Sequence, residues 1–504
     1  MKILSPKQTQ QLDAFTIENE PITSIDLMER AAQSFTDWLS DMLAPEEKKI
    51  KIFCGLRNNG GDGLAIARQL INLGYDITVF IIQHSDKMTL EFQENFSRLK
   101  NLTKIQYIDN QLVKVDLRED DLIIDAILGA GLNRPTEGLI QEVILQINES
   151  KAGIISIDIA SGLYADSPNA DTDVIVKPDF TLTFQMPKLA FMLPQNAEFV
   201  GNFQVLDIGL HQAFIDETET KYFYTDDASD LIKKRPKFSH KGTFGHALFI
   251  GGMHGMMGAA VLASRACVRS GVGKLTVHVP RCGTEIMQIS LPEALIWEGM
   301  DKAFINTDFW HQETLKMFSA IGIGPALGVD GKTLISLEKL FMVCENAKIP
   351  MVLDADVFNN LATNKGRTVI KKIPKNSILT PHPKEFQKLI GKPWKDDFEK
   401  LVFLSQFAVN HEVIICLKGA NTAIALPDGS IHFNSTGNAG MAKAGTGDVL
   451  TGIILALLAQ GYSPKDAAIL GVYEHGLAGD RTAEKWGEMS MLASDLVEEI
   501  RFLF

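Results

Sequence analysis

The sequence contains 504 residues, 45% of them hydrophobic and 22% charged, a composition typical of a soluble globular enzyme with two or three domains. Its formal net charge of −13 argues against a surface that binds nucleic acid or anionic lipid. The longest apolar run, Ile453 to Ala459, is far too short to span a membrane. We therefore expect neither a nucleic-acid partner nor a membrane partner.

The cysteines and the amino-terminal segment favour a cytoplasmic protein. No hydrophobic segment of a signal peptide follows Lys2. The cysteines are scattered, odd in number and form no CxxC pair, which disfavours a disulfide framework and a structural zinc site. We expect most of them to be buried free thiols; they are Cys54, Cys267, Cys282, Cys344 and Cys416.

The first part of the chain alternates strand-like and helix-like segments. Residues 50–54 read as a buried strand, residues 64–73 form an apolar helical face that ends at Gly74, and residues 75–82 read as the next strand. This βαβ pattern favours a parallel sheet with helices on both faces. Strands at 122–128 and 153–162, a helix at about 139–147, and closing strands DFTLTF and NFQVLDIGL continue it. We predict a Rossmann-like, three-layer α/β/α domain over residues 1–215.

The alternation stops between about Leu210 and Lys241, where the chain is polar and mixed in charge. We predict a linker over residues 216–240. A second α/β series then begins with a strand at 246–252, a helix of small residues at 258–270 and the strand KLTVHVP. Strands follow at AIGIG, PMVLDAD, NSILTPHP and VIICLKG, and the chain ends in helices. This series predicts a second α/β domain over residues 241–504.

A glycine-rich stretch, NNGGDG at residues 58–63, follows the first strand and leads into a helix. Free N–H groups and the dipole at a helix start suit a phosphate group, and glycines let the backbone approach it closely. The asparagine and aspartate oxygens are candidates to contact a sugar or a cation. The stretch is neither a Walker A sequence nor a GxGxxG fingerprint, so a purely structural turn is an open alternative.

Two further strand ends carry an aspartate followed by small residues. Asp125 ends one strand and Asp158 ends the next, three residues before Ser161. A buried aspartate is costly unless it is paired or coordinated, and the carboxyl ends of parallel strands gather at one edge of a sheet. These side chains and Asn59 are therefore candidates to converge, and oxygen ligands of low formal charge suit an alkali cation better than zinc. Helix caps and Asx-turns are the structural alternative.

At these motifs the first domain resembles the epimerase half of the bifunctional NAD(P)H-hydrate repair enzymes, in which an epimerase domain is fused to an ADP-dependent dehydratase domain. NNGGDG, DAILGAGLNRP and DIASG match that half in order. The resemblance implies that K⁺ is coordinated by Asn59, Asp125 and Ser161, and that Asp158 is catalytic with Lys188 of TFQMPKLAF as a candidate partner. It implies that the nucleotide hydrate contacts Asp158 and a set of loop residues: Asn58, Asn59, Gly60, Gly61, Asp62, Gly129, Ala130, Gly131, Leu132, Asn133, Arg134 and Pro135.

Epimerisation of a hydrated ring carbon requires either that the hydroxyl leaves and returns or that the ring opens and closes. Both routes need a group that carries a proton and a group that stabilises transient charge. A carboxylate such as Asp158, held beside the ring, performs both tasks. The sequence does not distinguish the two routes.

In the second domain the sharpest motif is AGTGD, residues 444–448, at the head of an apolar helix. Consecutive backbone N–H groups at a helix start form an anion hole for a phosphoryl group in transfer. An aspartate held there accepts a proton from a substrate hydroxyl, and Asp448 is our candidate; a helix cap is its structural alternative. Three strand-end loops support the motif, namely GIGPALG at 322–328, TPHPKE at 380–385 and KGANT at 418–422.

This domain resembles the ribokinase-like fold and, more narrowly, the hydrate dehydratase half of the same family, through HKGTFGHALFIGG, GAAVLASRA, LTPHPKEF and AGTGDVLTG. The resemblance implies that phosphorylation of the hydrate hydroxyl precedes loss of phosphate, with ADP converted to AMP and Mg²⁺ accompanying the nucleotide. It implies that the nicotinamide hydrate contacts Ala259, Gly324, His382 and Asp448. It implies that the adenine nucleotide contacts Lys418, Gly419, Ala420, Asn421, Thr422 and Gly447.

Two residues depart from the family pattern: Ala326 stands where glycine is frequent, and Lys384 replaces a common glycine after PHP. We expect activity to survive both. The substrates implied are NADH hydrate, NADPH hydrate and ADP, in a homo-oligomeric, multifunctional isomerase and lyase of metabolite repair. The alternative is a ribokinase-like small-molecule kinase fused to a non-catalytic nucleotide-binding scaffold.

Overall fold

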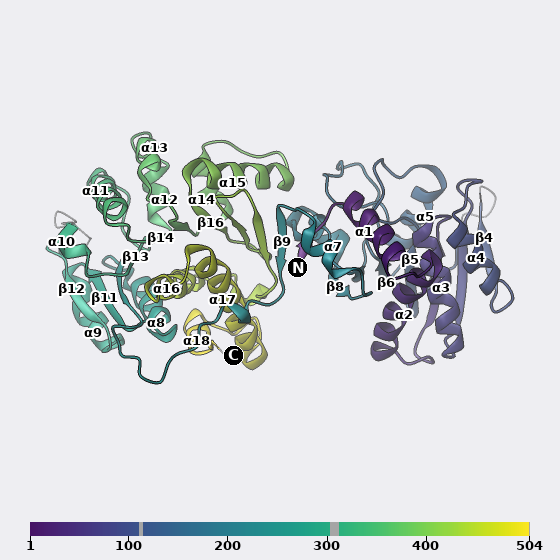
Figure 1. The fold of residues 1–504 in the computed structure, drawn as a ribbon, viewed down its shortest axis with the longest axis horizontal. Coiled ribbons are helices and arrows are strands. Elements are labelled where there is room, and N and C mark those ends of the chain that lie inside the picture. Colours follow the sequence, from purple (N-terminus) through teal and green to yellow (C-terminus); the bar gives the residue numbers. More distant parts are fainter. Residues whose placement is uncertain (110–113, 303–311, 503–504) are drawn as a thin grey trace. The chain divides into compact units, whose positions relative to one another are not determined.

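Two largely parallel β-sheets organise the chain in the computed structural model, which describes residues 1–109, 114–302 and 312–502 (Figure 1). The chain divides into one unit of residues 1–222 with 396–398 and a second of residues 223–395 with 399–504. The division falls inside the segment 216–240 that the sequence marks as a linker. That segment also contains strand β9 (Tyr222–Thr225) and a short 3₁₀ turn at Ser229–Leu231, so it is not irregular throughout.

The first unit alternates strands and helices, as the sequence predicts. Its elements are β1 (Lys2–Ile3), α1 (Pro6–Asn19), α2 (Ser24–Met42), β2 (Lys49–Cys54), α3 (Asn58–Asn72), β3 (Ile77–Ile82), α4 (Leu90–Leu99), β4 (Ile105–Ile108), β5 (Asp121–Ala126), α5 (Gly138–Glu149), β6 (Gly153–Ile157), β7 (Phe180–Phe184), α6 (Ala197–Val200), β8 (Asn202–Leu206) and α7 (Gln212–Glu217).

The sheet of the first unit has the order β4-β3-β2-β5-β6-β7-β8, and all of its pairings are parallel. Numbered along this sheet the order is 3-2-1-4-5-6-7, which extends the Rossmann arrangement. Helices α2, α3 and α4 pack together over one face, with α3 against β2 and β5. Both faces are covered, so strands such as β5 are buried along their whole length. The chain reverses its direction of winding between β2 and β5, and ligands of such folds bind at that point.

The NNGGDG stretch is helix rather than loop, which corrects the expectation of a glycine loop ahead of the helix. Arg57 is the N-cap, and Asn58 already belongs to the first turn of α3. A Cβ on Gly60 would stand 1.9 Å from the Gly55 carbonyl oxygen, and one on Gly63 would stand 2.5 Å from the Ala126 Cβ. These two glycines therefore let α3 lie directly on β2 and β5.

The second unit continues the alternation. Its elements after β9 are β10 (His246–Ile250), α8 (Met257–Arg269), β11 (Lys274–Val279), α9 (Thr284–Ser290), β12 (Leu295–Glu298), α10 (Gln312–Leu315), β13 (Ala320–Ile323), α11 (Gly331–Ala347), β14 (Met351–Leu353), α12 (Asp356–Leu361), α13 (Gly366–Val369), β15 (Ile378–Leu379), α14 (Pro383–Ile390), α15 (Asp397–His411), β16 (Ile414–Leu417), β17 (Ala423–Ala425), β18 (Ile431–Asn434), α16 (Thr446–Ala459), α17 (Pro464–Trp486) and α18 (Ala493–Glu498).

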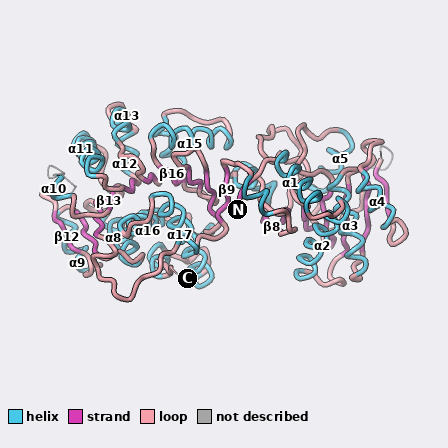
Figure 2. Tube along the Cα trace, viewed as in Figure 1, coloured by secondary structure: helices cyan, strands magenta, loops and turns pink. Residues whose placement is uncertain are grey.

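From β16 to β12 the second sheet runs β16-β15-β14-β13-β10-β11-β12 with parallel pairings, and β17 and β18 extend it antiparallel. Read from β12 to β16 and numbered in chain order, the parallel strands have the same order as in the first unit, 3-2-1-4-5-6-7. The direction of winding reverses between β10 and β13. Figure 2 shows its strands between two helical layers, α8, α16 and α17 on one side and α11 to α15 on the other.

The core of the second unit centres on α16, which is buried without interruption from Val449 to Ala459. It packs against α8, α17 and strands β10, β13 and β14, and burial of this apolar surface provides much of the unit's stability. The cysteines are free thiols, and four of the five are buried, as predicted. In the part of the chain that the structure describes, no helix is both long enough and apolar enough to cross a bilayer.

Candidate active sites

The first candidate site lies at the carboxyl ends of β5, β6 and β7, next to the start of α3. Its centre is an ion pair in which Lys188 Nζ donates to Asp158 Oδ1 at 2.7 Å. Thr183 Oγ1 and the Phe184 N–H also donate to Oδ1, each at 3.2 Å. The other carboxylate oxygen, Oδ2, has no hydrogen-bond partner among the described residues, so it is the atom available to a ligand.

The backbone at this ion pair is strained and tightly packed. Asp158 has a φ of 65°, in the left-handed region that non-glycine residues rarely adopt. The Lys188 side chain is only 4% exposed, whereas that of Asp158 is 20% exposed. An ammonium buried to this extent requires a negative partner, and Asp158 supplies it while keeping one face open.

Two further carboxylates, Asp13 of α1 and Asp62 of α3, act electrostatically on the same ion pair. Burial, the Asp158 charge and the Asp13 charge together raise the pKa of Asp62 well above its usual range. Burial and the Asp158 charge raise the pKa of Asp13 to about 6, although Lys188 lowers it. Three carboxylates therefore interact electrostatically at this site, and Asp158 and Asp13 also interact with the Lys188 ammonium. Sequence reasoning missed Asp13, which lies in a polar helix far from the glycine motifs.

The structure brings together the oxygen atoms that the sequence assigns to a cation. Asp125 is fully buried, and both Ser161 Oγ (2.5 Å) and Ser156 Oγ (2.8 Å) donate to its carboxylate. Burial raises the pKa of Asp125, and these hydrogen bonds oppose the rise. Asn59 donates from Nδ2 to the Ile157 carbonyl at 2.9 Å, while its Oδ1 is buried without a partner. A buried carbonyl oxygen without a donor is the type of ligand that K⁺ accepts.

The loop after β5 lies beside this cluster. A Cβ on Gly129 would meet the Asn59 side chain at 3.3 Å, and the Leu128 N–H donates to Ser161 Oγ at 2.8 Å. Four residues of this loop are exposed, as is the first residue of α3. These exposed residues are Gly131, Asn133, Arg134, Pro135 and Asn58.

The second candidate site is built on four neighbouring strands. Gly324 follows β13, Asp354 follows β14, His382 comes after β15, and Lys418 follows β16. Parallel strands end at one edge, so these residues face the start of α16, where Asp448 lies. Among the described residues, no three His, Cys, Asp or Glu side chains form a metal-binding cluster.

Asp354 and Lys418 form the central ion pair of this site. Lys418 Nζ donates to Asp354 Oδ1 at 2.8 Å, and Thr451 Oγ1 of α16 donates to Oδ2 at 2.9 Å. The Asp354 side chain is 3% exposed and that of Lys418 24% exposed. A Cβ on Gly447 would stand 3.0 Å from Lys418 Nζ, so the ammonium lies over the first turn of α16. Sequence reasoning missed Asp354, although it ends a strand just as Asp125 does.

Asp448 lies in the first turn of α16 and is not the helix cap. The N-cap is Gly445, with a φ of 96° and no side-chain capping bond. The Asp448 carboxylate has no hydrogen-bond partner among the described residues. Burial and the charge of Asp354 raise the pKa of Asp448 to about 7, while Lys418 lowers it. A carboxylate with such a pKa can take up and release a proton near neutral pH.

His382 has a structural role that sequence reasoning did not foresee. It is the N-cap of α14, and its Nδ1 accepts from the Lys384 and Glu385 N–H groups at 3.2 and 3.3 Å. Glu385 Oε2 completes a capping box by accepting from the His382 N–H at 2.9 Å. Because Nδ1 accepts, the ring proton is on Nε2. Burial and the charge of Lys418, with smaller contributions from Lys388 and Lys384, lower the pKa of His382.

The loop after β13 is held by close backbone contacts. Gly324 has a φ of 156°, and a Cβ there would stand 2.0 Å from the Asp354 carbonyl oxygen. Ala326 is 4% exposed with a φ of 56°, so alanine occupies a conformation that favours glycine. Ala259 is partly buried in the first turn of α8. In the loop after β16, Thr422 Oγ1 donates to the Gly419 carbonyl at 3.1 Å.

Fold and sites together define a two-domain α/β enzyme with a carboxylate–lysine site at the carboxyl edge of each sheet. Comparison with known proteins matches both domains to families. Residues 247–501 match the family model described as NAD(P)H-hydrate dehydratase, and residues 24–190 match the one described as YjeF-related protein N-terminus. The bifunctional NAD(P)H-hydrate repair enzyme Nnr of Moorella thermoacetica is 33% identical over 100% of this chain and 96% of its own length. That of Escherichia coli is 32% identical over 95% and 89%.

Among solved structures, the ADP/ATP-dependent NAD(P)H-hydrate dehydratase of Bacillus subtilis, co-crystallised with ATP and Mg²⁺, is 32% identical with a TM-score of 0.45. It covers 54% of this chain and 93% of its own. The full-length relatives decide the family: the chain belongs to the bifunctional NAD(P)H-hydrate repair enzymes. The family and the α/β fold class predicted from the sequence are confirmed.

Proposed function

We propose that the second domain dehydrates the S form of NAD(P)H hydrate with ADP, giving AMP and phosphate, and that the first domain interconverts the R and S forms. The observation that supports this most directly is the Asp448 carboxylate at the start of α16. It has no hydrogen-bond partner among the described residues, and it interacts electrostatically with Lys418 and Asp354. A general base and a cation at a helix start are the groups that phosphoryl transfer requires.

In the proposed dehydration, Asp448 accepts the proton of the hydrate hydroxyl. The hydroxyl oxygen of the hydrate attacks the β-phosphorus of ADP at the same time, and AMP leaves. The ring nitrogen then expels phosphate as a proton leaves the neighbouring carbon, and the dihydropyridine forms again. Ala259, Gly324 and His382 would hold the nicotinamide hydrate. The nucleotide would contact Gly447 and the loop of Lys418, Gly419, Ala420, Asn421 and Thr422.

The position of the Lys418 ammonium, over the first turn of α16, supports its assignment to the phosphate groups. Mg²⁺ bound to those phosphates would offset their charge. We propose that this ion arrives with the nucleotide, because the described residues contain no cluster of three acidic, histidine or cysteine ligands.

In the proposed epimerisation, Asp158 uses Oδ2 to carry a proton to and from the hydrate, while Lys188 holds Oδ1. The carboxylate also offsets positive charge that develops on the ring. The start of α3 and the loop of residues 129–135 would bind the rest of the nucleotide.

K⁺ fits the cluster of Asn59, Asp125 and Ser161, because Asn59 Oδ1 is buried without a donor. A bound K⁺ would supply a positive charge that anchors a phosphate or a transient oxyanion. Asp125 would balance that charge, and the Ser161 hydroxyl would orient the carboxylate. The cytoplasmic location and the homo-oligomeric state predicted from the sequence stay predictions.

One assay tests the proposed function. Mixed epimers of NADH hydrate are incubated with ADP, with ATP or with neither, and NADH absorbance, AMP and phosphate are followed. The proposal predicts NADH and equimolar AMP and phosphate with ADP. A stable phosphorylated hydrate without NADH would instead establish the kinase alternative. Failure to form either product would contradict both.

A further inference from the structure

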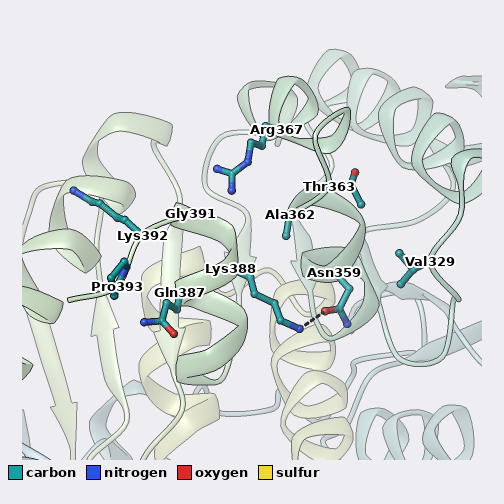
Figure 3. A pocket seen from close by; sticks show the side chains of 10 residues that line it. All are labelled: Val329, Asn359, Ala362, Thr363, Arg367, Gln387, Lys388, Gly391, Lys392 and Pro393. Carbon is teal, nitrogen blue, oxygen red and sulfur yellow. Dashed lines mark hydrogen bonds between the residues drawn. The ribbon is translucent and has the colours of Figure 1, made fainter. Parts of the chain in front are cut away.

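An open hollow of about 780 Å³ lies in the second unit, between helices α12, α13 and α14 (Figure 3). It is lined by Val329, Asn359, Ala362, Thr363, Arg367, Gln387, Lys388, Gly391, Lys392 and Pro393. Its volume is in the range of small-molecule sites. None of the residues assigned above to the dehydratase reaction lines it.

The hollow is positively charged, because its lining contains three cationic residues and no carboxylate. Lys392 lies over the Phe403 ring, 3.6 Å from its centroid, and points away from the hollow in Figure 3. Among the residues that the structure describes, the Lys388 ammonium makes a single hydrogen bond, a long one of 3.4 Å to Asn359 Oδ1. Arg367 has no ion-pair partner among the described residues, and its guanidinium lies against Gly391, where a Cβ would meet it at 2.4 Å.

The hollow adjoins the dehydratase site through three shared segments. α12 begins two residues after Asp354, α14 begins directly after His382, and Val329 lies at the end of the loop that follows β13. Lys388 lies six positions after His382, roughly 9 Å along the helix axis. The charge of Lys388 contributes to the lowered pKa of His382, so the two side chains interact. A ligand seated at His382 can therefore extend into the hollow.

We propose that the hollow receives the adenosine half of the dinucleotide hydrate and that Arg367 and Lys388 bind the 2′-phosphate that distinguishes NADPH hydrate from NADH hydrate. This inference rests on the proposed dehydratase function. An arginine is the usual partner of a 2′-phosphate in dinucleotide sites, because its fork matches phosphate oxygens. The side chains of Val329, Ala362 and Pro393 provide an apolar surface against which an adenine ring can pack.

The test compares Arg367→Gln, Lys388→Gln and the matched control Lys392→Gln in the full chain, with both hydrates as substrates. Each of the first two is expected to raise KM for NADPH hydrate about tenfold, with kcat and both constants for NADH hydrate unchanged. The control should change neither substrate. Equal losses with both hydrates, no change at all, or a raised KM for ADP would each overturn the proposal.

Binding provides a second readout that does not depend on turnover. In the absence of ADP, adenosine 2′,5′-bisphosphate should bind the Asp448→Asn parent protein more tightly than 5′-AMP does, and adding Arg367→Gln should remove the difference. Equal binding of the two probes to the parent protein would contradict the assignment. Failure of the proposed function is recognised separately, because the wild type would then regenerate neither NADH nor NADPH.

Discussion

Lys418 Nζ lies 2.8 Å from Asp354 Oδ1, although the two residues are 64 positions apart in the sequence and follow β16 and β14, which β15 separates in the sheet. Asp354 is almost completely buried and also accepts from Thr451 of α16. One carboxylate thus fixes the ammonium over the helix start and joins that helix to the sheet.

Asp354→Ala is expected to destabilise the protein by about 3 kcal/mol, because it leaves the Lys418 charge without its partner. Thr451→Val removes only a hydrogen bond and should cost about 1 kcal/mol. Denaturant unfolding of the full chain measures both. Equal small effects would show that the pair contributes little, and the assignment of Asp354 as the residue that positions Lys418 would then be wrong.

The dehydration rate is expected to depend on the ionisation of Asp448, whose pKa burial raises to about 7. The carboxylate is the active form of a base, so kcat/KM should fall about tenfold per pH unit below that value. Asp448→Asn should lower the rate at pH 8 by about 10²- to 10⁴-fold. A flat profile between pH 5.5 and 8 in the wild type would argue against proton transfer to this group.

Ionisation of the buried Asp13 carboxyl is expected to lower the free energy of unfolding as the pH rises. Its folded pKa of about 6 exceeds the ordinary value of 3.8, so the folded state binds more protons than the unfolded state between these values. Stability therefore falls as pH rises through this window. Asp13→Asn should be more stable than the wild type at pH 8, with the difference vanishing below pH 4. The exposed Glu18→Gln on the same helix is the control, and an equal response of both variants would contradict the placement of Asp13.

Gly60→Ala is expected to destabilise the first domain by about 3 kcal/mol, since the new methyl would overlap the Gly55 carbonyl. The control is Gly131→Ala, where no heavy atom lies within 4 Å of the added Cβ, and its effect should be below about 0.5 kcal/mol. Thermal unfolding compares the two. If Gly60→Ala were tolerated and lost only ligand binding, the glycine would serve the phosphate rather than the packing of α3.

The sequence predicted the order of strands and helices because apolar runs and glycine stops reflect local periodicity. It predicted the strand-end carboxylates Asp125 and Asp158 because parallel strands end at one edge. Asp354 obeys the same rule in the run LDAD and was available to that reasoning. Asp13 was not, since nothing in a polar helix indicates which distant residues it will lie near.

The interpretation of NNGGDG as a loop was wrong for a reason visible in the spacing. Gly60 and Gly63 are three residues apart and so share a helix face, here the face that lies on the sheet. The capping role of His382 was missed because histidine is an unusual cap, although the glutamate three residues later is the second half of a capping box.

The central claim, one catalytic site per domain acting on the two epimers, is tested most directly by progress curves with mixed epimers of NADH hydrate and ADP. Wild type should convert the whole mixture. Asp158→Asn should stop after the S fraction, and Asp448→Asn should form NADH at least about 10²-fold more slowly than the wild type. The two variants mixed together should again convert everything. Full conversion by Asp158→Asn alone at the wild-type rate, or no recovery in the mixture of the two folded variants, would contradict the account.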